Sequence, residues 1–359
     1  MKTAHAPDLV RLADLIESFA RQTILVLGDF VADEFVSGDI DRVSREAPVL
    51  ILRHRESQIL PGGGANATNN LADLGARVLP VAAVGDDASG EALRDYFRSK
   101  SVDTTGLVRV PRWTTPAKTR FLAGWTHTSS QQVLRMDREP ASELPDNAVK
   151  ALVRAAWERS PGSSAMVISD YGYGAAAPDV VRAVLTGRKR RGNRQERQPL
   201  RATLDSRYRL HEYAGLGLAA ATPNEAEIEA AHAARIGNDS GQLERLARRT
   251  MLRMGLGALV VTRGRDGMVV FERGRAPQAL SIFGSDQAVD VTGAGDTVIA
   301  AFSLALPAGA TVLEATHLAN YAAGIVVMKR GTATVTRQEL ASAIRADATG
   351  ATREEAPGS

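Results

Sequence analysis

The chain contains no cysteine. This absence excludes disulfide bonds, thiolate-bound iron–sulfur clusters and cysteine zinc sites, and it fits a reducing cytosol. Long apolar runs are also lacking, since no segment approaches the roughly 20 apolar residues that a membrane-spanning helix needs. The segment 1–20 alternates polar and apolar residues at helical spacing and has no continuous apolar core of the signal-peptide kind. We therefore expect a soluble, cytoplasmic protein with no membrane contact and with a surface helix near residue 1.

A large charge of one sign is lacking too. The 359 residues carry a formal net charge of +3, which is too small to require a nucleic-acid partner. The basic run GRKRRGNRQERQPLR at 187–201 has no interleaved aromatic residues and lies between an expected helix and an expected strand. We interpret it as a solvated loop and not as a nucleic-acid site. With 44% hydrophobic residues, the chain is long enough for one large domain with an accessory element, or for two domains.

Short β-branched runs alternate with longer helical patterns along most of the chain. This alternation predicts an α/β fold with a central, mainly parallel sheet flanked by helices. Ligands are expected at the carboxyl ends of the strands, because these ends meet at one edge of a parallel sheet. A helix is predicted at 65–74, and strands are predicted at 23–29, 77–85, 165–170, 202–205 and 258–264.

Two regions interrupt the alternation. Residues 34–57 and 117–137 contain extended segments with no helix between them, which predicts a small antiparallel β flap, here called the lid. The lid has too many apolar residues for a thin sheet with two wet faces, so we expect the lids of two chains to pack together in a homodimer. These apolar residues include Val49, Ile51, Phe121 and Leu134. Residues 1–345 would form the folded domain, and the polar segment 346–359 a disordered tail.

The segment DVTGAGD at 290–296 combines small residues with two aspartates before an apolar helical pattern. Gly293, Ala294 and Gly295 would let a phosphate group approach the backbone N–H groups at the N-terminus of that helix. Asp296 could then accept the proton of an attacking hydroxyl, as phosphoryl transfer requires. Alternatively, Asp296 only caps the helix, but a cap does not account for the glycines before it.

Three motifs, in order, resemble signatures of the PfkB/ribokinase family of sugar kinases. They are PGGGANATNNLADLGA at 61–76, TPNEAEI at 222–228 and DVTGAGD at 290–296. The resemblance covers about residues 23–345 and implies a ribokinase-like fold and a kinase that uses ATP and Mg²⁺, with Asp296 as the base. A catalytically silent sugar- or nucleotide-binding protein is the alternative from another class, and the presence of all three motifs argues against it.

The resemblance also implies where the sugar binds. Asp29 and Asp33, in the segment GDFVAD, would accept hydrogen bonds from sugar hydroxyls, although either could instead cap a turn. The glycine loop before the next helix would hold other hydroxyls, unless it only caps that helix. Its contacts would come from backbone N–H groups and one side-chain amide, at Gly62, Gly63, Gly64 and Asn66.

The N-x-x-E motif, Asn224 and Glu227, is where the family positions Mg²⁺ and its waters near the phosphates of ATP. The same spacing fits a helix capping box, which is the alternative reading of this pair. Mg²⁺ usually keeps several waters, so few direct protein ligands are needed. The other residues expected to line the nucleotide-binding site are Thr262, Gly264, Gly267 and Asn320.

Within the family, the resemblance is strongest to the D-glycero-β-D-manno-heptose-7-phosphate kinases, including the kinase half of the bifunctional ADP-heptose synthases. It rests on GDFVADEFVSGDIDRVSREAPV, SSQQVLRMD and SDYGYGAAAPDVV. This implies phosphorylation of the anomeric hydroxyl to a 1,7-bisphosphate, a precursor of ADP-heptose for lipopolysaccharide. A kinase for fructose, ribose or a fructose phosphate is the alternative. Since the kinase half of that group also ends here, we expect no nucleotidyltransferase module to follow.

Two departures from that group concern the phosphate at the far end of the sugar, here called the distal phosphate. Tyr173 stands where the group often has lysine, and DSRYR at 205–209 replaces Asp-Pro-Lys. A buried phosphate dianion without a cationic partner would be costly, so another cation must bind it. The candidates are Lys118, Arg120, Arg207 and Arg209. We prefer Arg207, because it follows the carboxyl end of a strand and guanidinium groups bind phosphate well.

Overall fold

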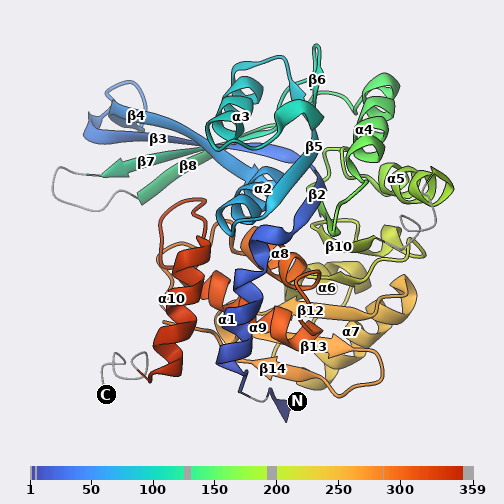
Figure 1. The fold of residues 1–359 in the computed structure, drawn as a ribbon. Coiled ribbons are helices and arrows are strands. Elements are labelled where there is room, and N and C mark those ends of the chain that lie inside the picture. The colour runs from blue at the N-terminus through green and yellow to red at the C-terminus, as the bar shows by residue number, and fades with distance from the viewer. Residues whose placement is uncertain (1, 5, 125–130, 192–199, 286, 351–359) are drawn as a thin grey trace.

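The computed structural model describes residues 2–4, 6–124, 131–191, 200–285 and 287–350. Its main sheet consists of β1 (Lys2–Thr3), β2 (Thr23–Gly28), β5 (Arg77–Gly85), β6 (Leu107–Val110), β9 (Ala165–Asp170), β10 (Arg201–Ser206), β11 (Ala220–Ala221), β12 (Ala258–Thr262), β13 (Met268–Glu272) and β14 (Gln278–Leu280). The strand order is β1-β14-β13-β12-β11-β10-β9-β2-β5-β6 (Figure 1). Neighbours are parallel except at β13, which is antiparallel to both of its neighbours. The predicted α/β fold with a mainly parallel sheet is confirmed.

Helices cover both faces of the main sheet, because alternate residues of its central strands point to opposite sides. In β2, Ile24 and Val26 join one apolar cluster, and Leu25 and Leu27 join the other. The first cluster includes α1 (Leu9–Glu17), α2 (Gly64–Asp73), α8 (Ala294–Ala305), α9 (Val312–Val326) and α10 (Arg337–Ala348). The second includes α4 (Asp146–Arg159), α5 (Pro178–Arg191), α6 (Glu225–His232) and α7 (Ser240–Met254).

The lid is a separate four-stranded sheet that projects from the main body, at the upper left of Figure 1. Its strands, in the order β4-β3-β7-β8, are β3 (Phe30–Val43), β4 (Leu50–Gly63), β7 (Ala117–Gly124) and β8 (Gln131–Arg138). The outer pairs are antiparallel, and β3 and β7 run parallel. The base of the lid packs against α3 (Ala88–Ser99). The lid thus forms where the sequence predicts it, and β3 and β4 continue beyond 34–57 into the main body.

The segments at the surface depart from the prediction in two places. The run 187–201 is not a loop throughout, because α5 continues to Arg191 and β10 begins at Arg201; residues 192–199 lie outside the described residues. The expected tail begins as helix, since α10 ends at Ala348, and residues 351–359 lie outside the described part. None of the helices in the described ranges combines the length and the apolar character needed to cross a bilayer.

Candidate active site

Three parallel strands, β2, β9 and β10, end side by side at one edge of the main sheet. Asp29 follows β2, Asp170 ends β9, and Asp205 lies near the end of β10. Helix α8 begins near the same edge, with Gly293 as its N-cap residue. The lid strand β3 begins at Phe30, directly after Asp29, and pairs with β7. The fold thus gathers the predicted site residues where ligands are expected in such sheets.

Asp296 lies in the first turn of α8, and its side chain is only 3% exposed. Its carboxylate accepts one hydrogen bond from Asn66 Nδ2 at 2.9 Å and another from the hydroxyl of Tyr171 at 2.8 Å. Neither partner belongs to α8, since Asn66 lies in α2 and Tyr171 follows β9. These contacts do not fit an aspartate that only caps its own helix.

The pKa of Asp296 is raised to about 7, chiefly because the side chain is buried and secondarily because Asp33 is close. The hydrogen bonds from Asn66 and Tyr171 and the charge of Lys118 act in the opposite direction. A carboxyl group that titrates near neutral pH can take up and release a proton under working conditions. Asp296 is therefore a buried carboxyl group that can exchange a proton near neutral pH.

The glycines before Asp296 serve different purposes. Gly293 has φ +78°, and a Cβ atom there would lie 2.4 Å from Asn66 Nδ2, so a side chain at this position would push Asn66 away from Asp296. A Cβ atom at Gly295 would meet nothing within 4 Å, because Gly295 faces two cavities. A ligand can thus approach the backbone at the start of α8 closely.

The first cavity has a volume of about 500 Å³ and is here called the transfer pocket. Its polar lining includes Asp205, Arg207, Thr222, Asn224, Glu227 and Asp296. The second, the apolar pocket, has a volume of about 590 Å³ and is lined by Met268, Phe283, Val298 and Val327. It also contains four predicted nucleotide-site residues, Thr262, Gly264, Gly267 and Asn320. Thr262, Val291 and Gly295 line both cavities, so the two are neighbours and could share one extended ligand.

Asn224 and Glu227 form the capping box that the sequence allowed. The backbone N–H of Glu227 donates to Asn224 Oδ1 at 2.8 Å, and the backbone N–H of Asn224 donates to Glu227 Oε2 at 2.9 Å. Glu227 nevertheless lines the transfer pocket, and burial raises its pKa to about 7, while the Asn224 N–H and Arg207 act to lower it. Capping and ligand binding therefore do not exclude each other at this residue.

A second carboxylate of the transfer pocket, Asp205, lies near Glu227. Its pKa is raised well above its usual range by burial and then by the charges of Glu227 and Asp296. The buried hydroxyl of Thr222, on the same pocket, has no hydrogen-bond partner within the described structure. Two close carboxylates and an unsatisfied oxygen suit a hydrated divalent cation. In the described ranges no three acidic, His or Cys side chains could hold a metal by themselves, so phosphate oxygens and waters would have to supply the other ligands.

On the sugar side, the two predicted aspartates have different partners. Asp33 is 4% exposed, pairs with Arg120 at 2.7 Å and lies against Gly62. Asp29 is also buried, but its carboxylate accepts three backbone hydrogen bonds. The donors, at 2.7–2.9 Å, are the N–H groups of Tyr171, Tyr173 and Ala175. Asp29 thus holds the loop after β9, as in the alternative in which it caps a turn.

The glycine loop and Asn66 differ from the prediction in a similar way. The backbone N–H of Gly64 donates to the carbonyl oxygen of Asp29, and Gly63 adopts φ +56° beside the same oxygen. The Asn66 amide is directed to Asp296 and not to an open sugar site, and its Oδ1 accepts from Asn70. The sequence pattern predicted that the glycine loop and Asn66 lie at the site, but not that their hydrogen-bond partners are other protein groups.

The four candidate cations fall into two pairs. Arg120 is bound to Asp33, and Arg209 forms an ion pair with the buried Asp170. Among the described residues, Lys118 and Arg207 make no salt bridge with a carboxylate. The pKa of Lys118 is lowered by burial and by the nearby positive charge of Arg207. The positive charges of Lys118 and Arg207, close to each other beside the transfer pocket, favour the binding of an anion there.

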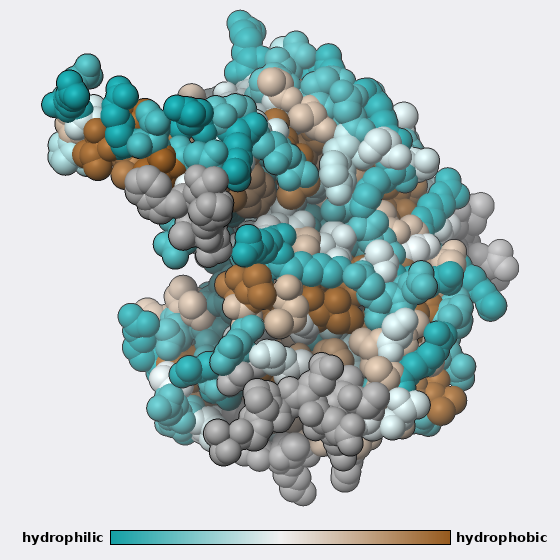
Figure 2. Space-filling view, turned by 90° about the vertical axis from the view of Figure 1, so that its left-hand side faces the viewer, coloured by the Kyte–Doolittle hydropathy of each residue, from teal (hydrophilic) through white to brown (hydrophobic). Residues whose placement is uncertain are grey.

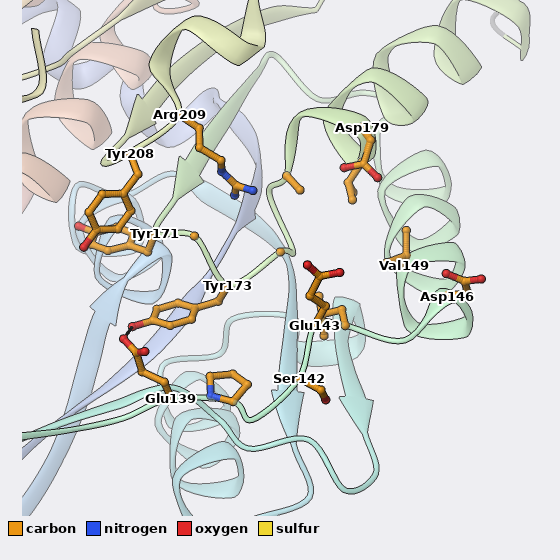
Figure 3. Close-up of a pocket in the computed structure, with 16 residues that line it drawn as sticks. Glu139, Ser142, Glu143, Asp146, Val149, Tyr171, Tyr173, Asp179, Tyr208 and Arg209 are labelled. Carbon is orange, nitrogen blue, oxygen red and sulfur yellow. Dashed lines mark hydrogen bonds between the residues drawn. The ribbon is translucent and has the colours of Figure 1, made fainter. Parts of the chain in front are cut away.

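A third cavity, of about 590 Å³, lies beside the loop after β9 (Figure 3). Tyr173 lines it at the position where the heptose kinases often have lysine, and its hydroxyl donates to Glu139 at 3.4 Å. Four carboxylates surround this cavity, those of Glu139, Glu143, Asp146 and Asp179. Its one arginine, Arg209, is already paired with Asp170. This cavity therefore disfavours an anionic ligand.

A fourth cavity, of about 660 Å³, separates the lid from the main body. Its lining includes Phe35, Gln58 and Arg120 from the lid and Asp290 and Arg330 from the body. The space-filling view shows the molecule deeply hollowed on this side (Figure 2). The lid thus stands open above the strand ends, and a substrate can enter beneath it.

Two residues of the site were missed by the sequence reasoning, Tyr171 and Asp205. Both follow or end a predicted strand at the ligand-binding edge, and this position was the only available signal. Their partners, Asp296 and Glu227, are more than 20 residues away or on other elements, so no local pattern could have linked them.

Comparison with known proteins agrees with the motifs. Residues 30–339 match the pfkB family of carbohydrate kinases. The bifunctional protein HldE of Gluconacetobacter diazotrophicus is 36% identical over 93% of this chain, and that of Geobacter sulfurreducens is 36% identical over 89%. The chain spans 66% and 62% of the lengths of these two relatives.

Solved structures show the same fold at lower sequence identity. The Arabidopsis thaliana ribokinase complexed with ribose and ATP has a TM-score of 0.67 and 20% identity. The Escherichia coli phosphofructokinase-2 in complex with substrates and products has a TM-score of 0.71 and 17% identity. Each comparison covers 90% of this chain and 98% of the other. The ribokinase-like fold is thereby confirmed. The family match confirms the predicted class, a sugar kinase, and the chain belongs to the pfkB family of carbohydrate kinases.

Proposed function

We propose that the protein phosphorylates the anomeric hydroxyl of D-glycero-β-D-manno-heptose 7-phosphate to give the 1,7-bisphosphate. The observation that carries the kinase chemistry is Asp296, buried at the start of α8 and bordering the transfer pocket. The choice of heptose is supported by the resembling segments and by the relatives named bifunctional protein HldE.

In this proposal Asp296 is the general base. As the anomeric oxygen attacks the γ-phosphorus of ATP, its proton passes to the Asp296 carboxylate, and the bond to the β-phosphate oxygen breaks to release ADP. Backbone N–H groups at Gly293 and Gly295 would face the negative charge that spreads over the transferred group. The N–H of Ala294, also predicted for this role, instead donates to the carbonyl oxygen of Val291 at 3.3 Å. Closure of the lid over the sugar would exclude water, which could otherwise accept the phosphoryl group.

The adenine and ribose of ATP would occupy the apolar pocket, and the phosphates would extend past Gly295 into the transfer pocket. Glu227 and Asn224 would hold Mg²⁺, directly or through water, with Asp205 and the unpaired hydroxyl of Thr222 beside them. When bound, Mg²⁺ supplies positive charge that offsets the negative charge of the phosphates.

The sugar would lie between the lid and the start of α8. Asp33 would accept hydrogen bonds from sugar hydroxyls, with Arg120 as its charge partner. The distal phosphate would bind Lys118 and Arg207, the two candidate cations without a carboxylate partner in the described chain. The cavity beside Tyr173 is unsuitable for the distal phosphate, because it is lined by carboxylates.

The experiment that tests this function is a substrate panel measured by ADP release. The panel contains the heptose 7-phosphate, the same heptose without phosphate, ribose, fructose and a fructose phosphate. We expect the highest kcat/KM for the heptose 7-phosphate. A preference for an unphosphorylated sugar would overturn the heptose 7-phosphate assignment, and ADP release that no sugar stimulates would favour a non-catalytic binding protein.

We also propose that the protein is a homodimer joined through the lid. Every residue of β8 is exposed, and large hydrophobic side chains are exposed on three of the lid strands and at Val49, directly before β4. They are Val43 (58%), Val49 (55%), Leu50 (44%), Val133 (44%), Leu134 (57%) and Met136 (51%). A patch of this kind on a thin sheet usually marks a protein–protein contact. A second lid is the occupant we favour, because it offers the same apolar surface by symmetry.

A further inference from the structure

Tyr171 contacts several parts of the site, but the proposed function assigns it no role. It follows β9 and is partly buried. Its backbone N–H donates to Asp29 Oδ2 at 2.9 Å, and its hydroxyl donates to Asp296 Oδ1 at 2.8 Å. Tyr171 is therefore fixed at its main chain by one buried carboxylate and directs its phenol to another.

The ring of Tyr171 also contacts the lid. The Nζ atom of Lys118, on β7, lies 5.3 Å from the ring centroid. A cation over an aromatic face is attracted by the ring, and it favours polarisation of the O–H bond towards the acceptor. Tyr171 thus lies between a lid cation and the carboxylate that is to act as the base.

We propose that Tyr171 is a positioning residue for Asp296: together with Asn66 it fixes both oxygens of the carboxylate, keeps the group ionised for proton transfer, and links it to Lys118 of the lid. This inference rests on the proposed function, in which Asp296 is the base. Asn66 donates to Oδ2 and Tyr171 to Oδ1, so the carboxylate cannot rotate without breaking both hydrogen bonds.

The direction of the hydrogen bond is set by the surroundings. Burial and the charge of Asp296 raise the pKa of Tyr171 well above its usual range, so the phenol keeps its proton and remains the donor. Other charged groups also act on Asp296. Asp33 of β3 raises its pKa and Lys118 of β7 lowers it. Asp205 of β10 is a further acidic group nearby, and its own pKa is raised by burial and by the charges of Glu227 and Asp296. Loss of the Tyr171 hydroxyl removes a stabilising donor from the ionised form, so the pKa of Asp296 must rise.

The test is Tyr171→Phe, which removes one oxygen and keeps the ring beneath Lys118. We expect kcat at pH 7 to fall about 10-fold, as for one lost hydrogen bond to a charged group, with KM for ATP within about 2-fold of wild type. The acidic limb of the kcat/KM profile should move up by about one pH unit, since a tenfold change corresponds to one unit. Activity should therefore recover in part as the pH is raised.

The matched control is Tyr213→Phe. Tyr213 is fully buried, and its hydroxyl donates to the carbonyl oxygen of Ala176 at 2.7 Å, with no contact to Asp296. We expect this variant to lose stability while the position of the acidic limb stays that of wild type. A shift of equal size in both variants would overturn the proposal, because it would show a general effect of losing a buried tyrosine hydroxyl.

A second measurement keeps the inference testable if Tyr171→Phe folds poorly. Incorporation of 3-fluorotyrosine at position 171 makes the phenol a stronger donor, so the acidic limb should move to lower pH. An unchanged limb in a folded, active protein would overturn the positioning role. If Asp296→Asn is inactive while the position-171 variants behave like wild type, only this inference fails. If Asp296→Asn remains active, the proposed base itself is wrong.

Discussion

At the scale of single residues, Asp296 combines two requirements that oppose each other. Burial favours its neutral form, whereas a general base must be ionised. Asn66 and Tyr171 partly offset the cost of burying the charge, and the balance leaves the pKa at about 7. A buried carboxylate of this kind is expected to lower the free energy of unfolding of the protein, while its raised pKa makes it reactive.

The variant Asp296→Asn tests both sides of this balance. It keeps the shape of the side chain but cannot accept the proton, so kcat should fall about 10²-fold or more. ATP binding, measured by calorimetry, should be retained. Near-normal turnover by the folded variant would contradict the mechanism.

The same variant should be more stable than wild type at pH 8 and similar to it at pH 4. The pKa of Asp296 is raised from its ordinary value of 3.8 to about 7, so wild-type stability declines as the pH rises through this window, and the decline is complete above pH 7. The rise of about three units corresponds to at most about 4 kcal/mol. Thermal unfolding of both proteins at pH 4 and pH 8 checks this prediction. An equal stability difference between variant and wild type at the two pH values would argue against a buried charge at Asp296.

Arg207→Ala tests the distal phosphate. We expect KM for the phosphorylated heptose to rise 10-fold or more, on the scale of one lost charge-assisted hydrogen bond, while KM for ATP stays nearly unchanged. Arg120→Ala should differ, because it also leaves the buried Asp33 without its charge partner. If Arg207→Ala instead raises KM for ATP alone, Arg207 binds the nucleotide phosphates.

The residue predictions also show what a sequence can reveal about a site. The place of Gly293 and Asp296 at the start of a helix was predictable, because glycines before an apolar helical pattern are typical of a helix N-terminus. The partners of Asp29 and Asn66 were not, because they are set by where the loop after β9 and the start of α8 come to lie. A carboxylate that binds a sugar and one that binds three backbone N–H groups look the same in the sequence.

At the scale of elements, α6 starts with a capping box that also borders the transfer pocket. The sequence predicted the spacing of Asn224 and Glu227, but spacing alone could not distinguish capping from metal binding. The strands β2, β5, β9, β10 and β12 of the main sheet were predictable, because their apolar runs are buried on both faces. The strands β1, β6, β11, β13 and β14 were not predicted. The extension of α5 to Arg191 was missed, because its basic residues carry no apolar periodicity.

Glu227→Gln separates the two roles of the capping box. Glutamine keeps an oxygen that can accept from the Asn224 N–H, so the helix start should be preserved. We expect lower activity and a higher Mg²⁺ concentration for half-maximal rate, because a negative charge is lost. Asp239→Asn provides a control, since Asp239 caps α7 away from both pockets. A change in melting temperature without a change in Mg²⁺ dependence would leave capping as the only role.

At the scale of the whole molecule, the lid is attached along one side and leaves a wide hollow open beneath it (Figure 2). Its existence and position were predictable from the interrupted alternation of strands and helices. The parallel pairing of β3 with β7 was not, because it depends on how two distant hairpins meet.

Leu134→Asp tests the association of lids. A charge in the centre of an apolar contact should prevent dimer formation, so light scattering should report a dimer for wild type and a monomer for the variant at micromolar concentration. Leu252→Asp is the matched control, because Leu252 is 84% exposed on α7 and outside the lid. A wild-type monomer would contradict the proposed homodimer.

The short strand β1 has a consequence for how the protein behaves at high concentration. Lys2 and Thr3 pair with β14, and Ala4 adds a backbone hydrogen bond to Ala279. These residues cover an edge that would otherwise present free N–H and C=O groups for the addition of another strand. Because β1 is only two residues long, it offers little template for the addition of a further strand. Removing residues 1–4 would uncover β14 and should make the protein prone to aggregate, even though no residue of the site has been touched.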